Sequence, residues 1–192
     1  MQDTKEAILR TALALFSAQG FEAVSVSDIA GALHMTKGAL YRHYENKQAI
    51  FDAILRRMEQ RDTELAEAEE MPLEGESSVI TLQELFSFSK TMLRYWVKDD
   101  FAAAFRRMLT VEQYRSETLL QLYQQYLAMG PVEYVAMLLT SLQMEDAEEK
   151  ARTLCGIMHL CYSLCDASAD ADRELARTER ILDELEESWS GK

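Results

Sequence analysis

The chain has 192 residues and a formal net charge of −13, and 48% of its residues are hydrophobic. Glycine and proline are scarce and helix-forming residues are plentiful, which is typical of an all-helical protein with an ample core. An odd number of cysteines, 3, argues against a disulfide framework, and no apolar run approaches the roughly 20 residues of a membrane-spanning helix. Because the N-terminus also lacks a secretory-signal pattern, we expect a soluble cytoplasmic protein with no membrane partner.

The N-terminal part is expected to form short helices around a tight turn. A helix over residues 4–19 ends at Gly20, which suits a left-handed C-terminal position. Ser25 begins a second helix, and Thr36 caps a third over residues 37–43. Two short helices joined in this way are typical of a helix-turn-helix DNA-binding unit.

A larger helical body is expected to follow. The fourth helix connects to it and ends before a break at residues 71–78, which contains Pro72 and Gly75. The fold predicted is all-α, with a three-helix helix-turn-helix DNA-binding domain over residues 1–48 and a helical ligand-binding and dimerisation domain over residues 49–192. Further body helices are expected over about 79–97, 101–129 (as two helices), 131–143, 147–167 and 171–188.

The charge is unevenly distributed along the sequence. Residues 1–60 are neutral overall, so the rest of the chain carries the whole −13. A neutral segment can still attract phosphate if its basic groups share one face, whereas the acidic remainder cannot be a nucleic-acid surface.

The third expected helix carries small and polar residues that suit a DNA groove. Lys37 can reach a guanine edge or a phosphate, and Tyr41 can contact a phosphate or a thymine methyl group. Gly38 allows the backbone to approach DNA closely. Thr36 and Ser25 can bind phosphates while they also cap helices. For His43, the alternative to a DNA contact is a surface histidine without a function. The residues expected to contact double-stranded DNA are Ser25, Ser27, Thr36, Lys37, Gly38, Tyr41, Arg42, His43 and Lys47.

The same segment resembles the TetR (tetracycline-repressor-like) family of bacterial transcriptional regulators, over about residues 4–55. The resemblance implies a homodimer with a three-helix DNA-binding head, a body that binds a small ligand and a two-helix dimer contact near the C-terminus. His34 departs from the glycine that the family usually has between its second and third helices. The motif that carries the resemblance is Ser25-x-x-Asp28-Ile-Ala, then Thr36-Lys-Gly-x-Leu-Tyr41-x-His-Tyr44-x-x-Lys47.

The last two expected helices have the pattern of a dimer contact. Residues 154–165 are apolar on nearly every side of a helix, so more than one surface must cover them. The final helix repeats large apolar residues at the spacing of a helix-pairing seam. We expect a four-helix contact between two copies, although both helices could instead be core helices of one chain. The expected dimer residues are Leu154, Met158, Cys161, Cys165, Leu175, Leu182, Leu185 and Trp189.

The middle of the body is rich in aromatic and methionine side chains. Such residues line pockets for flat or hydrophobic ligands, although a plain helical core is the alternative for each of them. The acidic body favours a cationic ligand, but its arginines suit an anion equally, so the effector's class stays open. The candidate pocket residues are Phe86, Tyr95, Trp96, Phe105, Met108, Tyr123, Tyr126 and Met137.

The cysteines do not predict a metal site. Cys155, Cys161, Cys165 and His159 lie on one helix, where their spacing cannot enclose a single ion. We therefore expect no metal and no cofactor, with the cysteines acting as small hydrophobic residues. A redox role, or a site completed across a dimer, stays open.

These features predict a ligand-responsive transcriptional regulator, in the first instance a repressor. It would bind an inverted-repeat operator as a homodimer and be released by a small-molecule effector. The alternative is a DNA-binding regulator without a small ligand, controlled by a protein partner or by cysteine oxidation. An enzyme is not expected, because the sequence has no nucleophile elbow, phosphate loop or metal-ligand spacing.

Overall fold

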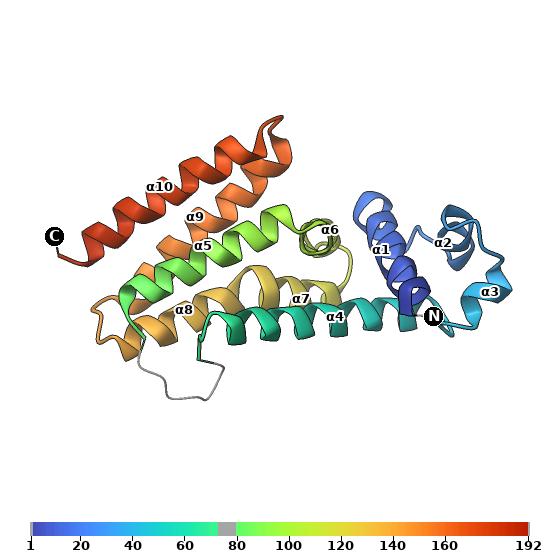
Figure 1. Ribbon diagram of the computed structural model, residues 1–192, viewed down its shortest axis with the longest axis horizontal. Coiled ribbons are helices and arrows are strands. Elements are labelled where there is room, and N and C mark those ends of the chain that lie inside the picture. Colours follow the sequence, from blue (N-terminus) through green and yellow to red (C-terminus); the bar gives the residue numbers. More distant parts are fainter. Residues whose placement is uncertain (1, 73–79, 192) are drawn as a thin grey trace. The chain divides into compact units, whose positions relative to one another are not determined.

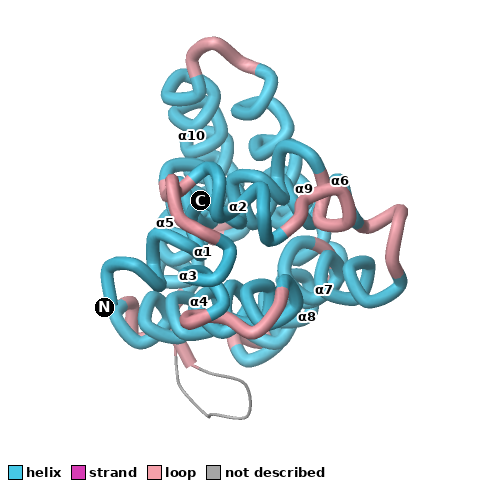
Figure 2. The backbone as a smooth tube through the Cα atoms, turned by 90° about the vertical axis from the view of Figure 1, so that its right-hand side faces the viewer, coloured by secondary structure: helices cyan, strands magenta, loops and turns pink. Residues whose placement is uncertain are grey.

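The computed structural model describes residues 2–72 and 80–191, and all regular secondary structure in these ranges is α-helical (Figure 2). The prediction of an all-α fold is confirmed, while most of the expected break at 71–78 lies outside the described residues. No helix in these ranges is long and apolar enough to cross a membrane. The helices are α1 (Gln2–Gln19), α2 (Val26–Ala32), α3 (Lys37–Tyr41), α4 (Lys47–Ala68), α5 (Leu82–Lys98), α6 (Asp100–Glu112), α7 (Glu117–Leu127), α8 (Met129–Ser141), α9 (Ala147–Ala167) and α10 (Ala171–Trp189).

The chain divides into two compact units. The N-terminal unit comprises residues 1–65 and 101–121, and the C-terminal unit comprises residues 66–100 and 122–192. The N-terminal unit is therefore larger than the DNA-binding domain predicted over 1–48, because most of α4 and all of α6 after its first residue cluster with α1–α3.

The core of the N-terminal unit is made by apolar side chains that recur every three or four residues on α1 and α4. On α3, Leu40 is the single buried residue, so the rest of this short helix is left for the surface. Fully buried core residues are Ile8, Ala12, Phe16, Ile29, Leu40, Ile50 and Ile54.

The helix ends in this unit are fixed by the caps expected from the sequence. The backbone N–H of Asp28 donates to Ser25 Oγ at 3.2 Å, and Asp28 Oδ2 accepts from the N–H of Ser25 at 2.7 Å. The hydrogen bonds that the hydroxyl and the N–H of Ser25 donate to Asp28 Oδ2 lower the pKa of the Asp28 carboxyl. Thr36 Oγ1 accepts from the N–H of Ala39 at 3.1 Å. α3 ends at Tyr41 rather than at the expected residue 43.

His34, in the turn between α2 and α3, has a φ of 52°. Histidine tolerates this left-handed region less well than glycine, although glycine loses more backbone entropy on folding. We expect His34→Gly to leave the thermal unfolding midpoint unchanged or raise it by a few degrees, and His34→Ala to give no gain. Circular dichroism melting checks this, and a clear loss of stability in His34→Gly would contradict a relief of backbone strain.

In the C-terminal unit, α5, α9 and α10 lie side by side (Figure 1). Phe86 of α5 meets Trp189 of α10 with ring centroids 5.3 Å apart. Basic residues spaced four apart along α5 pair with carboxylates of α10, and such surface pairs orient helices more than they stabilise them. The pairs are Lys90–Asp183, Arg94–Glu179 and Lys98–Asp172.

Candidate DNA-binding site

The outer face of α3 carries the residues expected to bind DNA. Lys37, Gly38, Tyr41 and Arg42 are all exposed, while Leu40 turns into the core of the N-terminal unit. Tyr41 keeps 44% of its surface exposed, which is high for a large side chain. The Lys37 ammonium lies 5.8 Å from the centroid of the Tyr41 ring, so the two side chains share one face.

Of the residues that flank α3, Ser25 and Thr36 have the capping role expected for them, while their contact with phosphate stays a prediction. Ser25, Ser27 and Thr36 are exposed, and His43 is half-buried. The hydroxyl of Ser25 donates to Asp28 Oδ2 at 2.7 Å, while Thr36 caps α3. Their cap geometry holds the ends of both helices at the surface, where these hydroxyls are accessible to a bound phosphate.

Gly38 has no structural reason to be glycine within this chain. A Cβ added at this position would meet nothing within 4 Å, and its φ is not positive. Glycine within a helix lowers stability by about 0.5–1 kcal/mol relative to alanine. Alanine at position 38 would therefore favour the helix more than glycine does. Glycine leaves this exposed position of α3 without a side chain, which suits a close approach to another molecule.

Lys47 is placed differently from the phosphate clamp expected from the sequence. Its ammonium donates to the carbonyl oxygens of Phe21 at 2.7 Å and Glu22 at 3.3 Å. It also lies 4.3 Å from the centroid of the Phe21 ring, and 22% of its side chain is exposed. Lys47 thus joins the first turn of α4 to the α1–α2 turn, a structural role that the sequence did not indicate, and its contact with DNA stays a prediction.

The residues expected in a dimer contact lie mostly inside the single chain. Leu154, Cys161 and Leu182 are fully buried, and Cys165 and Leu175 are 7% exposed. Side chains already covered within one chain cannot provide the surface for a second copy, so these five are core residues, as the alternative interpretation held. Met158, Leu185 and Trp189 are half-buried.

The outward faces of α9 and α10 carry other large apolar residues. Leu160 and Leu164 of α9 are 59% and 43% exposed, and Ile181 of α10 is 47% exposed. Gly156, one turn before Leu160, is also exposed and would meet nothing if it carried a Cβ. The sequence predicted an uncovered apolar side on α9, but it did not identify which residues form it.

The structure places the candidate pocket residues on α5, α6, α7 and α8. Phe86 and Phe105 are fully buried, and Trp96 and Met108 are core residues of their own units. Tyr95 packs edge-on against Trp96, and the half-buried Tyr126 and Tyr123 lie on α7, where the Tyr123 hydroxyl is 3.3 Å from His159 Nε2. Of the residues predicted, Met137 alone lines the cavity described next.

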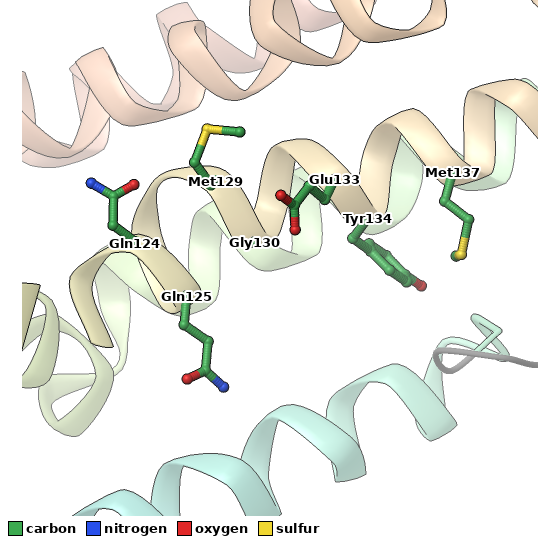
Figure 3. A pocket seen from close by; sticks show the side chains of 7 residues that line it. All are labelled: Gln124, Gln125, Met129, Gly130, Glu133, Tyr134 and Met137. Atoms are coloured by element: carbon green, nitrogen blue, oxygen red, sulfur yellow. The ribbon is translucent and has the colours of Figure 1, made fainter. Parts of the chain in front are cut away.

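A cavity of about 540 Å³ lies at the corner between α7 and α8 in the C-terminal unit. Gly130 permits this corner, because a Cβ there would lie 2.0 Å from the carbonyl oxygen of Gln125. Tyr134 donates its hydroxyl to the Pro72 carbonyl at 2.9 Å, and burial raises its pKa to about 12, so the phenol stays neutral. The lining residues are Gln124, Gln125, Met129, Gly130, Glu133, Tyr134 and Met137 (Figure 3).

The cysteines are free thiols in the C-terminal unit. Burial raises the pKa of Cys155 to about 12, which disfavours the reactive thiolate. The sulfur atoms of Cys161 and Cys165 lie 3.7 Å apart and both residues are buried. Among the described residues, no group of three or more histidine, cysteine or carboxylate side chains is arranged to hold a metal ion.

Comparison with known proteins places the helix-turn-helix segment in one family. Residues 8–54 match the family described as bacterial regulatory proteins, tetR family. The chain is 43% identical over 53 residues to the HTH-type transcriptional regulator AcrR of Shigella flexneri, covering 28% of this chain and 25% of AcrR. It is 39% identical over 54 residues to the tetracycline repressor protein class C of Escherichia coli, covering 28% and 25% of the two chains. The chain therefore matches about a quarter of the length of these curated relatives.

The fold likeness extends over nearly the whole chain. A TetR-like transcriptional regulator from Rhodococcus sp. RHA1 superposes with a TM-score of 0.67, at 22% identity, over 97% of this chain and 96% of that one. Identity at this level concerns the fold alone, whereas the motif around α2 and α3 is shared at the sequence level. Taken together, these likenesses show that residues 8–54 are a segment of the tetR family of bacterial regulatory proteins, and that the fold of TetR-like regulators extends over nearly the whole chain.

Proposed function

We propose that this protein is a transcriptional repressor that binds an inverted-repeat operator as a homodimer and is released by a small molecule. The observation that carries the proposal is the face of α3, where Lys37, Gly38 and Tyr41 are exposed and a Cβ added at Gly38 would meet nothing within 4 Å. Repression, rather than activation, is suggested by the tetracycline repressor among the relatives that share this segment.

The chemistry of this face fits a major groove. Lys37 is a donor for guanine N7 and O6 or for a phosphate, and Tyr41 offers a hydroxyl and a ring for a thymine methyl group. The hydroxyls of Ser25 and Thr36 and the side chain of Arg42 would position α3 through the DNA backbone. Lys47 acts indirectly, because it holds the α1–α2 turn.

The homodimer is proposed to form through the outward faces of α9 and α10. Leu160, Leu164 and Ile181 are exposed there, and exposed apolar residues grouped on adjacent helices are typical of an interface between subunits. A two-fold dimer would present two copies of α3 to half-sites separated by about one turn of DNA, roughly 34–36 Å.

The effector is proposed to bind at the α7–α8 corner. The cavity there falls in the size range of about 300–1,000 Å³ that is usual for small-molecule sites. Its two glutamines and Glu133 offer hydrogen bonds, and Met129 and Met137 offer adaptable apolar contacts. A thermal-shift screen tests this, because a ligand that binds only the folded state raises its melting temperature.

The experiment that tests DNA binding is selection of bound duplexes from a random pool. We expect the wild-type protein to recover an inverted repeat, and Lys37→Ala and Tyr41→Ala to lose it while they remain folded. Recovery of no preferred sequence by the wild-type protein at moderate salt, or of the same repeat by both variants, would contradict the proposal.

Control by cysteine oxidation is the weaker alternative. Burial disfavours the thiolate of Cys155, and Cys161 and Cys165 are buried. We expect hydrogen peroxide treatment of the folded protein to leave operator affinity within about twofold, with thiol titration as the check on the extent of oxidation. A large, thiol-reversible loss of affinity would favour redox control instead.

A further inference from the structure

The turn between α1 and α2 is held by a buried carboxylate from a distant part of the sequence. Glu112, the last residue of α6, is 1% exposed. Its Oε1 accepts a hydrogen bond from the backbone N–H of Phe21 at 2.9 Å and another from Arg115 Nη1 at 3.2 Å. The backbone of the DNA-binding segment is thereby fixed to a side chain 91 residues later.

Gly20 has no side chain, and this leaves room for the Glu112 carboxylate beside the α1–α2 turn. Its φ is +90°, a conformation that favours glycine, and a Cβ at this position would lie 2.6 Å from Glu112 Oε1 and 2.5 Å from Arg115 Nη1. Glycine is therefore needed both for the backbone conformation and for the close approach of the Glu112–Arg115 pair.

Phe21 receives contacts from α4 as well as from α6. Its carbonyl oxygen accepts a hydrogen bond from the Lys47 ammonium at 2.7 Å, and its N–H donates a hydrogen bond to Glu112. The Phe21 ring lies between those of Phe16 and Phe51, at centroid distances of 5.1 and 5.0 Å. One residue of the turn thus links the end of α6 to the start of α4, which directly follows the segment that contains α3.

Nearly all of α6 lies in a segment of the N-terminal unit whose two ends both connect to the C-terminal unit. The polypeptide passes between the two compact units at residues 65/66, 100/101 and 121/122. The segment 101–121, which contains nearly all of α6, accounts for two of these three crossings. Within the N-terminal unit, Glu112 lies where α6 meets the α1–α2 turn.

We propose that Glu112 is a positioning residue for DNA recognition, which holds the helix-turn-helix in its binding orientation through the N–H of Phe21. This inference rests on the proposed DNA-binding function. A contact that depends on the reach of one side chain is sensitive to a small shift of α6, so its loss lowers operator affinity without a change in any DNA-facing residue.

Two conservative substitutions test the length of the Glu112 side chain and its negative charge separately. Glu112→Asp keeps the charge but withdraws the acceptor by one methylene group, and we expect operator affinity to fall on the order of tenfold. Glu112→Gln keeps an amide oxygen within reach of the Phe21 N–H, and we expect affinity within about threefold of wild type. Glu117→Asp makes the same change at an exposed carboxylate in the first turn of α7, and it is the matched control that is expected to retain affinity.

Affinities are measured at a temperature at which circular dichroism shows every variant to be folded, and amide hydrogen exchange at Phe21 is followed in parallel. We expect faster exchange at Phe21 in Glu112→Asp but not in Glu117→Asp. Wild-type affinity in folded Glu112→Asp, or an equal loss in Glu112→Gln, would overturn the positioning role. Failure of the wild-type protein to bind any duplex would instead overturn the proposed function, so the two failures are distinguishable.

Discussion

Replacing Gly38 by alanine is expected to stabilise the fold and weaken operator binding at the same time. The new methyl group meets no atom within 4 Å, and alanine within a helix is more stable than glycine by about 0.5–1 kcal/mol. The same methyl group projects from the exposed face of α3 into the space that the DNA would occupy. We expect Kd for the operator to rise on the order of tenfold, which corresponds to about 1.4 kcal/mol. Chemical denaturation and fluorescence anisotropy measure the two effects separately.

Gly31 offers a matched control for this substitution. It is also an exposed helical glycine, in the last turn of α2, and a Cβ there would meet nothing within 4 Å. Gly31→Ala should therefore stabilise the fold similarly while leaving operator affinity unchanged. If Gly38→Ala bound the operator as tightly as wild type, the exposed face of α3 would not be the surface that approaches DNA.

Local sequence signals were sufficient for the order of the helices and for several of their ends, although α3 and α8 end two residues earlier than expected. The cap residues Ser25 and Thr36 form the expected hydrogen bonds, and α9 has the bounds 147–167 that the sequence predicted. Caps and hydrophobic periodicity act over three or four residues, so a single sequence shows them directly. The start of α9 has no such cap, because Asp146 adopts a φ of 54° and its side chain makes no cap hydrogen bond.

Contacts between distant segments were not predictable in the same way. The apolar spacing of α10 indicated a helix-pairing seam, but it could not show that the partner is α5 of the same chain. Lys47 was assigned to DNA because it follows α3, whereas its ammonium contacts carbonyl groups 25 and 26 residues earlier. Glu112 was missed, since nothing in its local sequence indicates a burial that depends on Phe21 and Arg115.

Replacing Leu160 by glutamate is expected to separate the proposed homodimer into monomers. Leu160 is 59% exposed on α9, Leu164 is exposed one turn further along the same helix, and Ile181 is exposed on α10. A carboxylate buried in the contact without a partner loses hydration, and two-fold symmetry would bring a second carboxylate close to it. We expect the dimer Kd to rise at least on the order of a hundredfold, measured by sedimentation equilibrium.

The control places the same charge at a residue outside the proposed interface. Met137 of α8 is 37% exposed and lines the α7–α8 cavity, so Met137→Glu is expected to remain dimeric. Leu160→Glu should keep the helical circular dichroism of the wild type, because its side chain is not part of the core. Its operator affinity should nevertheless fall by several orders of magnitude, since each monomer contacts only one half-site and the gain from simultaneous binding is lost. A Leu160→Glu protein that stays dimeric would place the contact between subunits on another face, and a monomer that binds the full operator tightly would remove the need for a dimer.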